Sequence, residues 1–179
     1  MSKRQLITID SMMPDSKIRW ERYADGNGVI DKFSKEDWHK IASDIDSEEE
    51  LRELLEEFPH KIQAFVLYEN GTNEAIGFIY LLKERRNYKT LSYHGGGWKR
   101  SIKFTYLYLR GTILMIEHIL SQGYKVQTYC SIENSKAYKF MQSLGFVKYS
   151  IAESSIRQWI NTKRLRNSLI YKKIFLQKT

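Results

Sequence analysis

The sequence predicts a mixed α/β fold, and three observations lead to this prediction. The chain has 179 residues, of which 42% are hydrophobic and 28% are charged, a composition typical of a globular domain with one substantial core. An Asn-Gly dipeptide separates two apolar runs between residues 61 and 83, which indicates an antiparallel hairpin. After residue 90, strand-like and helix-like hydrophobic patterns alternate along the chain. A mixed sheet with a hairpin in its first half follows from this order.

One short strand and several helices are expected in the first 60 residues. Residues 4–10 alternate apolar and polar side chains, which is typical of a strand. Asp15, Ser34 and Ser47 each precede residues with helical spacing and can cap the first turn of a helix.

The segment 61–94 is expected to supply three strands. Two of them form the hairpin, with its turn at residues 69–73. The third strand runs from Thr90 to His94 and is followed by three consecutive glycines.

A long buried helix is expected over residues 102–122. Apolar residues occur on nearly every side of this segment, but polar residues interrupt it too often for a membrane-spanning helix. Gly123 is expected to end the helix, because glycine readily adopts the left-handed conformation found there. Residues 124–131 then alternate in character and predict a strand.

Four elements are expected after this strand. A helix over residues 134–144 is indicated by four apolar residues at helical spacing, and Gly145 ends it. The other three are a strand at 146–151, a short helix or loop at 154–164, and a final strand at 168–176.

Charge is distributed unevenly along the chain. Residues 1–60 contain 9 basic and 15 acidic residues, a net charge of −6, whereas residues 61–179 contain 20 basic and 6 acidic residues, a net charge of +14. The basic part could hold nucleic acid, a membrane surface or a phosphorylated cofactor, or could be a solvated surface with no partner.

Several classes of protein are excluded by what the sequence contains. The single cysteine, Cys130, cannot form an intramolecular disulfide or build a thiolate metal site alone, so no metal site is expected. No run approaches the ~20 apolar residues that span a bilayer. The basic N-terminus is not followed by the apolar region of a secretory signal. These observations favour a soluble cytoplasmic protein.

The segment 131–146 (SIENSKAYKFMQSLGF) carries the most informative pattern in the chain. Its key positions are Asn134, Ala137, Phe140, Gly145 and Phe146. Their spacing resembles the strand–helix–strand segment of the GNAT-type N-acetyltransferases, and the expected element order over residues 60–150 also matches that fold. The resemblance implies a GNAT-like mixed, mostly antiparallel central sheet flanked by helices. It also implies acetyl-CoA as co-substrate and an amine as acceptor.

Asn134 can be interpreted in two ways. It lies where a strand gives way to a helix, so its amide can cap the helix, face a ligand, or do both. In the GNAT family this Asn contacts the pantetheine arm of coenzyme A, which is the role that the resemblance implies here.

The phosphate-binding loop departs from the family pattern. GNAT enzymes usually carry a Gln/Arg-x-x-Gly-x-Gly/Ala string whose backbone N–H groups hold a pyrophosphate at a helix N-terminus. No such string precedes the helix at 102–122. In its place the expected cofactor-binding residues are Gly96, Gly97, Lys99, Arg100 and Ser101, with Lys103 as a further cation. Alternatively, the glycines form a bulge that ends the strand.

The acid and base of the reaction are also expected at unusual positions. Many family members carry a Tyr directly after the helix aromatic, where it protonates the departing thiolate, but Met141 stands here and cannot donate a proton. Tyr138 lies one helical turn earlier and could substitute, and Tyr129 is another candidate. His94 is the expected general base, with an unperturbed pKa near ~6.5, and Glu133 is a weaker candidate.

The resemblance also organises the chain as a single GNAT-like acyltransferase domain over residues 1–179. It would comprise a helical acceptor-side region (1–60), a cofactor-binding core (61–150) and a C-terminal helix and strand (151–179). In this fold the early helices border the acceptor site. Their net charge of −6 would favour a cationic amine, while the +14 of the remainder would favour the anionic cofactor.

Three functions are weighed. The first is an N-acetyltransferase that transfers an acetyl group directly from acetyl-CoA to a small-molecule or peptide amine, with neither nucleic acid nor membrane as partner. The apolar and aromatic content of the chain permits a homodimer. The second is a catalytically inactive GNAT-fold protein that binds CoA or a macromolecular partner, which Met141 and the atypical loop favour. The third is a nucleic-acid-binding module built on basic residues near two aromatics: Lys163, Arg164, Arg166, Lys172 and Lys173, with Trp159 and Tyr171. The lysines of a final strand could equally protect a sheet edge.

Overall fold

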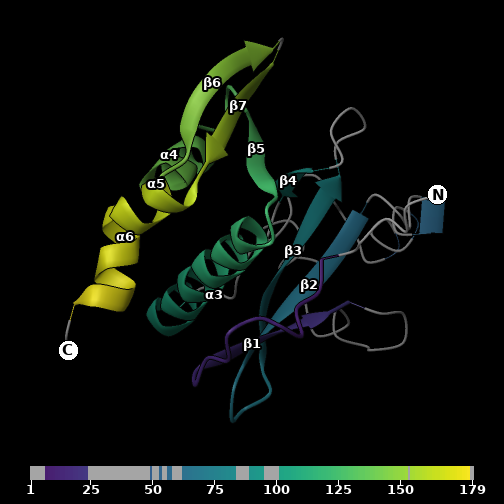
Figure 1. Cartoon of the computed structure of the whole chain (residues 1–179), viewed down its shortest axis with the longest axis vertical. Helices are drawn as coiled ribbons and strands as arrows, with labels where there is room; N and C mark the ends of the chain where they lie inside the picture. Colours follow the sequence, from purple (N-terminus) through teal and green to yellow (C-terminus); the bar gives the residue numbers. More distant parts are fainter. Residues whose placement is uncertain are drawn as a thin grey trace. The chain divides into compact units, whose positions relative to one another are not determined.

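The structure of the chain is a computed structural model that describes residues 7–23, 49, 53, 56, 57, 62–83, 89–94, 101–152 and 154–177. The chain is organised as two compact units (Figure 1). The first unit comprises residues 1–82 and 94–111, and the second comprises residues 83–93 and 112–179.

The first unit is built on three antiparallel strands, β1 (Ile18–Arg22), β2 (Ile62–Glu69) and β3 (Ala75–Lys83), in the order β1-β2-β3. The hairpin that the Asn-Gly dipeptide predicts is confirmed as β2 and β3. Its turn contains the positive φ angles that such a connection needs, 91° at Gly71 and 56° at Asn73. All residues of β2 except the last are buried, so both faces of this strand belong to the core.

The N-terminal predictions are wrong for the described residues. Residues 7–10 of the expected first strand form no strand, and the helix expected after Asp15 is instead β1. The Asp15 Oδ1 accepts a hydrogen bond from the Lys17 backbone N at 2.9 Å, which makes a local turn rather than a helix cap. Ile18 and Trp20 are buried, whereas Arg19 between them is not, as expected for a strand with one covered face. The helices expected from Ser34 and Ser47 lie outside the described residues, apart from four helical positions at 49, 53, 56 and 57.

The long helix α3 (Ile102–Ser121) confirms the helix expected over 102–122, and its first half belongs to the first unit. Gly111 is the point of close approach between this half and the strands. The indole Nε1 of Trp20 donates a hydrogen bond to the Gly111 carbonyl oxygen at 3.0 Å. A Cβ on Gly111 would lie 2.7 and 2.8 Å from the two methyl carbons of Leu67, and 3.2 Å from the Ile18 Cδ1. The helix therefore packs on β1 and β2 through a position with no room for a side chain.

Gly111→Ala is expected to destabilise the protein by about 1–2 kcal/mol, although alanine normally gains about 1 kcal/mol over glycine inside a helix. The reason is overpacking against Leu67, which is fully buried. In a Leu67→Ala background the space is open, and Gly111→Ala should become neutral or stabilising. A double-mutant cycle of urea unfolding measures the difference. Equal effects in both backgrounds would contradict the close contact.

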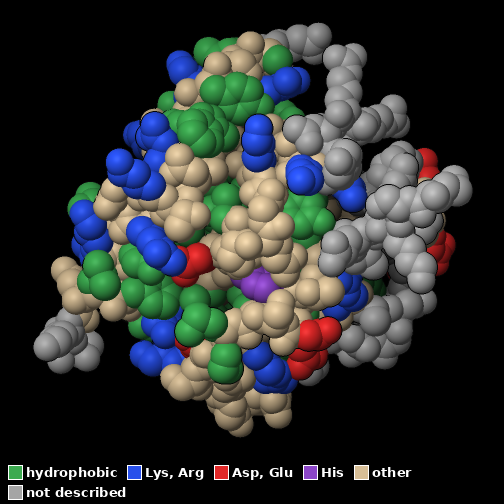
Figure 2. Space-filling view, in the orientation of Figure 1, with side chains coloured by type: hydrophobic (Ala, Val, Ile, Leu, Met, Phe, Trp, Pro, Cys, Tyr) green, Lys and Arg blue, Asp and Glu red, His purple; other side chains and the backbone are tan. Residues whose placement is uncertain are grey.

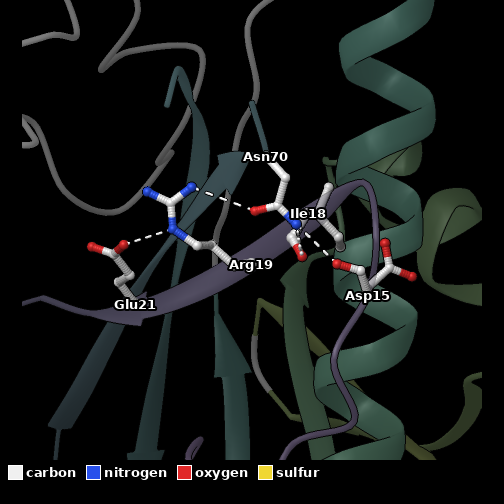
Figure 3. Close-up of polar contacts among 5 residues, drawn as sticks. All are labelled: Asp15, Ile18, Arg19, Glu21 and Asn70. Carbon is white, nitrogen blue, oxygen red and sulfur yellow. Dashed lines mark hydrogen bonds and ion pairs between the residues drawn. The ribbon is translucent and has the colours of Figure 1, made fainter. Parts of the chain in front are cut away.

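An ion pair holds the segment before β1 against α3. The Arg110 Nη2 lies 2.6 Å from the Asp15 Oδ2, and the two side chains are 17% and 9% exposed. Figure 3 shows the adjoining polar contacts, in which Asn70 from the hairpin turn reaches toward the segment around Asp15 and Arg19. The Asn70 Nδ2 donates to the backbone oxygens of Asp15 at 2.9 Å and Ile18 at 3.1 Å. One amide side chain thus satisfies two backbone groups of the chain entering β1.

Acid is expected to weaken the first unit through Asp15. Burial raises the pKa of this carboxyl, but the hydrogen bonds from Arg110 and from the Lys17 and Ile18 backbone, with the Arg110 charge, outweigh burial and leave the pKa below its ordinary value of 3.8. A lowered folded-state pKa means that the stabilisation is present above the unfolded-state pKa and is lost as the pH falls through the folded-state pKa. Asp15→Asn should therefore cost about 1–3 kcal/mol at pH 7 and flatten the acid limb of the stability curve.

The matched control for this prediction is the exposed ion pair of Arg19 and Glu21. The Arg19 Nε lies 2.8 Å from the Glu21 Oε1, and the two side chains are 36% and 43% exposed. Glu21→Gln should change the free energy of unfolding by less than about 1 kcal/mol, because exposed ion pairs contribute little. Urea unfolding at several pH values distinguishes the two substitutions, and equal losses would contradict a special role for Asp15.

The second unit contains β4 (Thr90–His94) except for its last residue, His94, which belongs to the first unit. It also contains β5 (Lys125–Ser131), β6 (Val147–Ala152) and β7 (Ser155–Ile160), in the order β4-β5-β7-β6. β4 and β5 are parallel, whereas β7 pairs antiparallel with both β5 and β6. Figure 1 shows β5, β7 and β6 as neighbouring strands of one twisted layer. The expected mixed, mostly antiparallel sheet with flanking helices is confirmed.

The helices of the second unit are α4 (Ser135–Ser143), α5 (Thr162–Asn167), α6 (Leu169–Tyr171) and the π-helical segment η2 (Lys172–Leu176), together with the second half of α3. α4 confirms the helix expected at 134–144, and Gly123 and Gly145 have the expected positive φ angles of 81° and 100°. Among the described residues, no helix is both long and apolar enough to cross a membrane.

Two C-terminal predictions are wrong. The segment expected as a short helix or loop is largely the strand β7, and the final strand expected at 168–176 is helical. The six residues of β7 were not predicted as a strand because pairing with β5 and β6 fixes this strand, and that pairing is not visible in the local pattern. The lysines at 172 and 173 therefore lie on a helix and protect no sheet edge.

Candidate functional site

The site begins where β4 and β5 stop pairing. These parallel strands are in register at Thr90↔Lys125, Leu91↔Val126 and Ser92↔Gln127, although both strands continue beyond these pairs. The next contact is made by a side chain, since the Thr128 hydroxyl donates to the Tyr93 carbonyl oxygen at 3.0 Å. Ligands of sheets with parallel strands commonly bind beyond the carboxyl ends of such strands.

Buried polar groups fix the strands at this point. The Tyr93 hydroxyl lies 3.4 Å from the Thr112 hydroxyl of α3, and both side chains are fully buried. On the β5 side the Ser92 hydroxyl accepts from the Gln127 Nε2 at 3.1 Å. These bonds span α3, β4 and β5, so they hold the carboxyl end of β4 in one position within the second unit.

Asn134 follows β5 directly and caps α4. Its Oδ1 accepts a hydrogen bond from the Ala137 backbone N at 3.0 Å, so the interpretation as an N-cap is confirmed. The residue is exposed, and its side-chain oxygen is occupied by the cap while the NH₂ group of the same amide can donate. The structure therefore allows the cap and a ligand contact at once.

Tyr138 lies one turn further along α4, so the structure brings it together with Asn134. Its hydroxyl accepts a hydrogen bond from the Gln142 Nε2 at 3.0 Å, on the same helix. Met141 is 8% exposed and packs into the core of the second unit. The residue at the position of the usual family tyrosine is therefore a packing residue in this chain.

His94 belongs to the first unit, at the end of β4. Its imidazole stacks on the Tyr80 ring of β3, with centroids 5.0 Å apart and an interplanar angle of 9°. Tyr80 is buried and His94 is half-buried, so the tyrosine ring covers one face of the imidazole.

The expected phosphate-binding residues fall mostly outside the described part of the chain. These are Gly96, Gly97, Lys99 and Arg100. Ser101 is described, and its hydroxyl accepts from the Phe104 backbone N at 3.0 Å, which makes it a cap of α3. Lys103 makes an ion pair with Glu69, with 2.7 Å between Nζ and Oε1, so part of its charge is neutralised within the first unit. The hydrogen bond from Lys103 lowers the pKa of the Glu69 carboxyl.

The remaining sequence candidates differ in character. Burial raises the pKa of the Cys130 thiol, against an opposing hydrogen bond from Gln158, so this buried cysteine is a poor nucleophile. Glu133 is exposed beside Asn134. The Tyr129 hydroxyl accepts from the Gln127 Nε2 at 2.7 Å. In the described ranges, no group of three or more His, Cys, Asp or Glu residues could hold a metal ion.

Sequence reasoning missed a polar and aromatic cluster on β5, β6 and β7. Gln127 is at its centre, because it donates to Ser92 and Tyr129 and accepts from the Tyr149 hydroxyl at 3.0 Å. The period-two spacing of Gln127 and Tyr129 was visible in the sequence. Their partners across the sheet were not, because β7 was expected to be a helix or loop.

Comparison with known proteins finds solved structures that have a similar fold but little sequence identity to this chain. No protein-family model matches the chain, and no curated protein sequence matches it. Among solved structures, the nucleotide-linked sugar GNAT FdhC aligns with a TM-score of 0.65 and 16% identity over 90% of this chain and 96% of that protein. A variant of the spermidine N-acetyltransferase SpeG from Vibrio cholerae aligns with a TM-score of 0.63 and 15% identity over 86% and 98% of the two chains. SpeG in complex with CoA and spermine aligns with a TM-score of 0.59 and 14% identity over 86% and 100%.

These alignments cover most of this chain and nearly the whole length of each solved structure. Identities of this size carry information on the fold alone, and the fold agrees with the one that the pattern around Asn134 implies. The chain therefore has the fold of the GNAT-type N-acetyltransferases.

Proposed function

We propose that this protein is an N-acetyltransferase that moves an acetyl group from acetyl-CoA directly to an amine. The observation that carries the proposal is Asn134, which caps α4 directly after β5 in a GNAT fold and keeps an amide NH₂ group for a ligand. The proposal takes residues 1–179 as one acyltransferase domain, with residues 1–60 on the acceptor side.

The proposed reaction is a single displacement. The amine nitrogen forms a bond to the acetyl carbonyl carbon, the bond between this carbon and sulfur breaks, the amine loses one proton, and the thiolate gains one. We assign the removal of the amine proton to His94, whose ring is held by Tyr80. We assign the return of a proton to the thiolate to Tyr138, oriented by Gln142. Gly96, Gly97, Lys99, Arg100 and Ser101 are proposed to bind the phosphates of the co-substrate.

The proposed acceptor is a small-molecule or peptide amine, in a protein that works in the cytoplasm and as a homodimer. SpeG, a similar structure, is described in complex with CoA and spermine, a small-molecule amine, and also as a dodecamer, a larger oligomer than the one proposed here. The alternative function, an inactive GNAT-fold protein that binds CoA or a macromolecular partner, is favoured by the buried Met141.

The test is the affinity for coenzyme A of two cap variants. Asn134→Ala removes the α4 cap and the proposed ligand contact, whereas Asn161→Ala removes only a cap, since the Asn161 Oδ1 accepts from the Arg164 backbone N at 2.9 Å at the start of α5. Each should cost about 1 kcal/mol of stability. Only Asn134→Ala is expected to raise the Kd for acetyl-CoA, by about tenfold for one lost hydrogen bond. Calorimetric titration gives the result, and equal affinities for the two variants would remove the ligand role of Asn134.

A further inference from the structure

Five side chains form an open surface on one face of β5, β6 and β7. They are Gln127, Tyr129, Tyr149, Arg157 and Trp159, and together they are called the aromatic face. Residues directly opposite in an antiparallel pair point to the same side of the sheet, and the register pairs Gln127 with Trp159 and Tyr129 with Arg157. Tyr149 lies on this side too, since its hydroxyl donates to the Gln127 Oε1.

The aromatic face is accessible, whereas the other side of β5 and β7 is largely core. Tyr149 is 48% exposed and Trp159 is 38% exposed. The alternate residues Val126, Thr128 and Gln158 are buried. A sheet with one covered face normally presents polar side chains on its open face, so large exposed aromatic rings there suggest a binding surface.

Two guanidinium groups lie on the rings of this face. The Arg157 Cζ is 5.3 Å from the centroid of Tyr129, and the Arg164 Cζ, from α5, is 5.4 Å from the centroid of Trp159. Aromatic rings and guanidinium planes both stack on nucleobases, and the N–H groups of arginine match phosphate oxygens. The face thus combines the two kinds of group that bind a nucleotide.

The strands that form this face and the helices that follow β5 carry charge of one sign. None of the elements β5, α4, β6, β7, α5, α6 and η2 contains an Asp or Glu, and together they carry ten Lys and Arg residues. Figure 2 shows Lys and Arg side chains among hydrophobic ones in the region where β6 and β7 lie in Figure 1. A polycationic amine would be repelled by Arg157 and Arg164, whereas an anionic ligand would be attracted.

We infer that the acceptor is an amine carried by a nucleoside diphosphate, with its base on the rings of the aromatic face and its phosphates at Arg157 and Arg164. This inference rests on the proposed function. It also connects to the proposed reaction site, because Gln127 hydrogen-bonds to Ser92 at the last pair between β4 and β5. A ligand bound on this face would direct its amine toward the end of that pairing.

The inference changes two expectations from the sequence. The basic residue Arg164 and the aromatic Trp159 were grouped as a nucleic-acid surface, and the structure places the guanidinium group of Arg164, from α5, over the ring of Trp159 on β7. The short span of three strands and the link to Ser92 favour a single nucleotide over a polymer. A cationic acceptor, suggested by the acidic N-terminal charge, is disfavoured by the cations beside the rings.

The test is calorimetric titration of the full chain with UDP, dTDP, GDP and ADP in the presence of saturating CoA, which keeps these probes out of the cofactor site. At least one should bind saturably. Tyr149→Ala and Arg157→Gln should each raise its Kd at least tenfold, as one lost stacking or charged contact requires. Tyr149→Phe, which keeps the ring, and Lys173→Gln, which removes an equal charge on η2, should leave the Kd within about twofold. Circular dichroism confirms that the variants fold.

The other outcomes contradict, in turn, the nucleotide inference, the proposed function, or the choice of a single nucleotide as the ligand. If CoA binds and none of the four probes does, the inference is wrong and the proposed function stands. If a probe binds but CoA does not, the proposed function fails and the aromatic face is a nucleotide site without an acyltransferase. If a single-stranded oligonucleotide binds far more tightly than any probe, with a steep salt dependence, the ligand is a nucleic acid instead.

Discussion

Gly145→Ala is expected to destabilise the protein by about 3 kcal/mol, which corresponds to a loss of roughly 10 °C in Tm for a chain of this size. Gly145 ends α4 with a φ of 100°. A Cβ at this position would lie 2.6 Å from the Arg164 carbonyl oxygen and 2.9 Å from its carbon. Two costs combine: alanine resists the left-handed conformation, and the obstructing atoms belong to the backbone of α5 and cannot rotate away.

Gly123→Ala separates these two costs. Gly123 also has a positive φ, of 81°, but a Cβ there would meet no atom within 4 Å. The expected loss is therefore only the conformational part, about 1–2 kcal/mol. Thermal and urea unfolding of the two variants give the comparison. If they lose the same stability, the close approach between Gly145 and α5 does not exist in solution.

His94→Gln is expected to lower kcat by roughly 10²–10⁴-fold, because the reaction loses the group proposed to accept the amine proton. The KM for acetyl-CoA should change little, since this residue is not assigned to the co-substrate. The pH profile adds a second readout: the wild-type rate should fall in acid as the base becomes protonated, and the variant should lose this limb.

His118→Gln is the matched control for His94. His118 is buried, whereas His94 is half-buried, and the His118 Nε2 lies 2.8 Å from the Gln122 Nε2 on α3. The same substitution there should leave kcat within about threefold if the two histidines differ as proposed. A small loss at His94 with an unchanged pH profile would mean that this imidazole only packs on Tyr80.

The fold was predictable where local signals decide the structure. The Asn-Gly turn specifies the hairpin of β2 and β3, and the spacing from Asn134 to Gly145 specifies α4 and its end. β1 was not predictable, because Asp15 hydrogen-bonds to Lys17 in a turn that resembles a helix cap in sequence. β7 is fixed by its register with β5, which is distant in sequence, as well as with the adjacent β6, so its own alternation was not decisive.

The candidate site also has one part that was predictable from local sequence and one part that was not. Asn134 was predictable because its role as a cap is local, and its family pattern spans only one strand–helix–strand segment. The aromatic face was not, since it forms only when Gln127 and Tyr129 meet Trp159 and Arg157 across the sheet. Tertiary pairing, rather than any motif, brings these residues together.

The position of β7 has a consequence for folding during synthesis. β7 lies between β5 and β6, yet it follows both of them in the chain. The partner edges of β5 and β6 therefore stay open on a nascent chain until residues 155–160 have been made. Open edges of this kind can pair with other chains, and pairing over long sequence separations is slow. We therefore expect a ribosome-bound chain that stops before β7 to be aggregation-prone, and pairing of the β6–β7 hairpin with β5 to be a late step in the folding of the second unit.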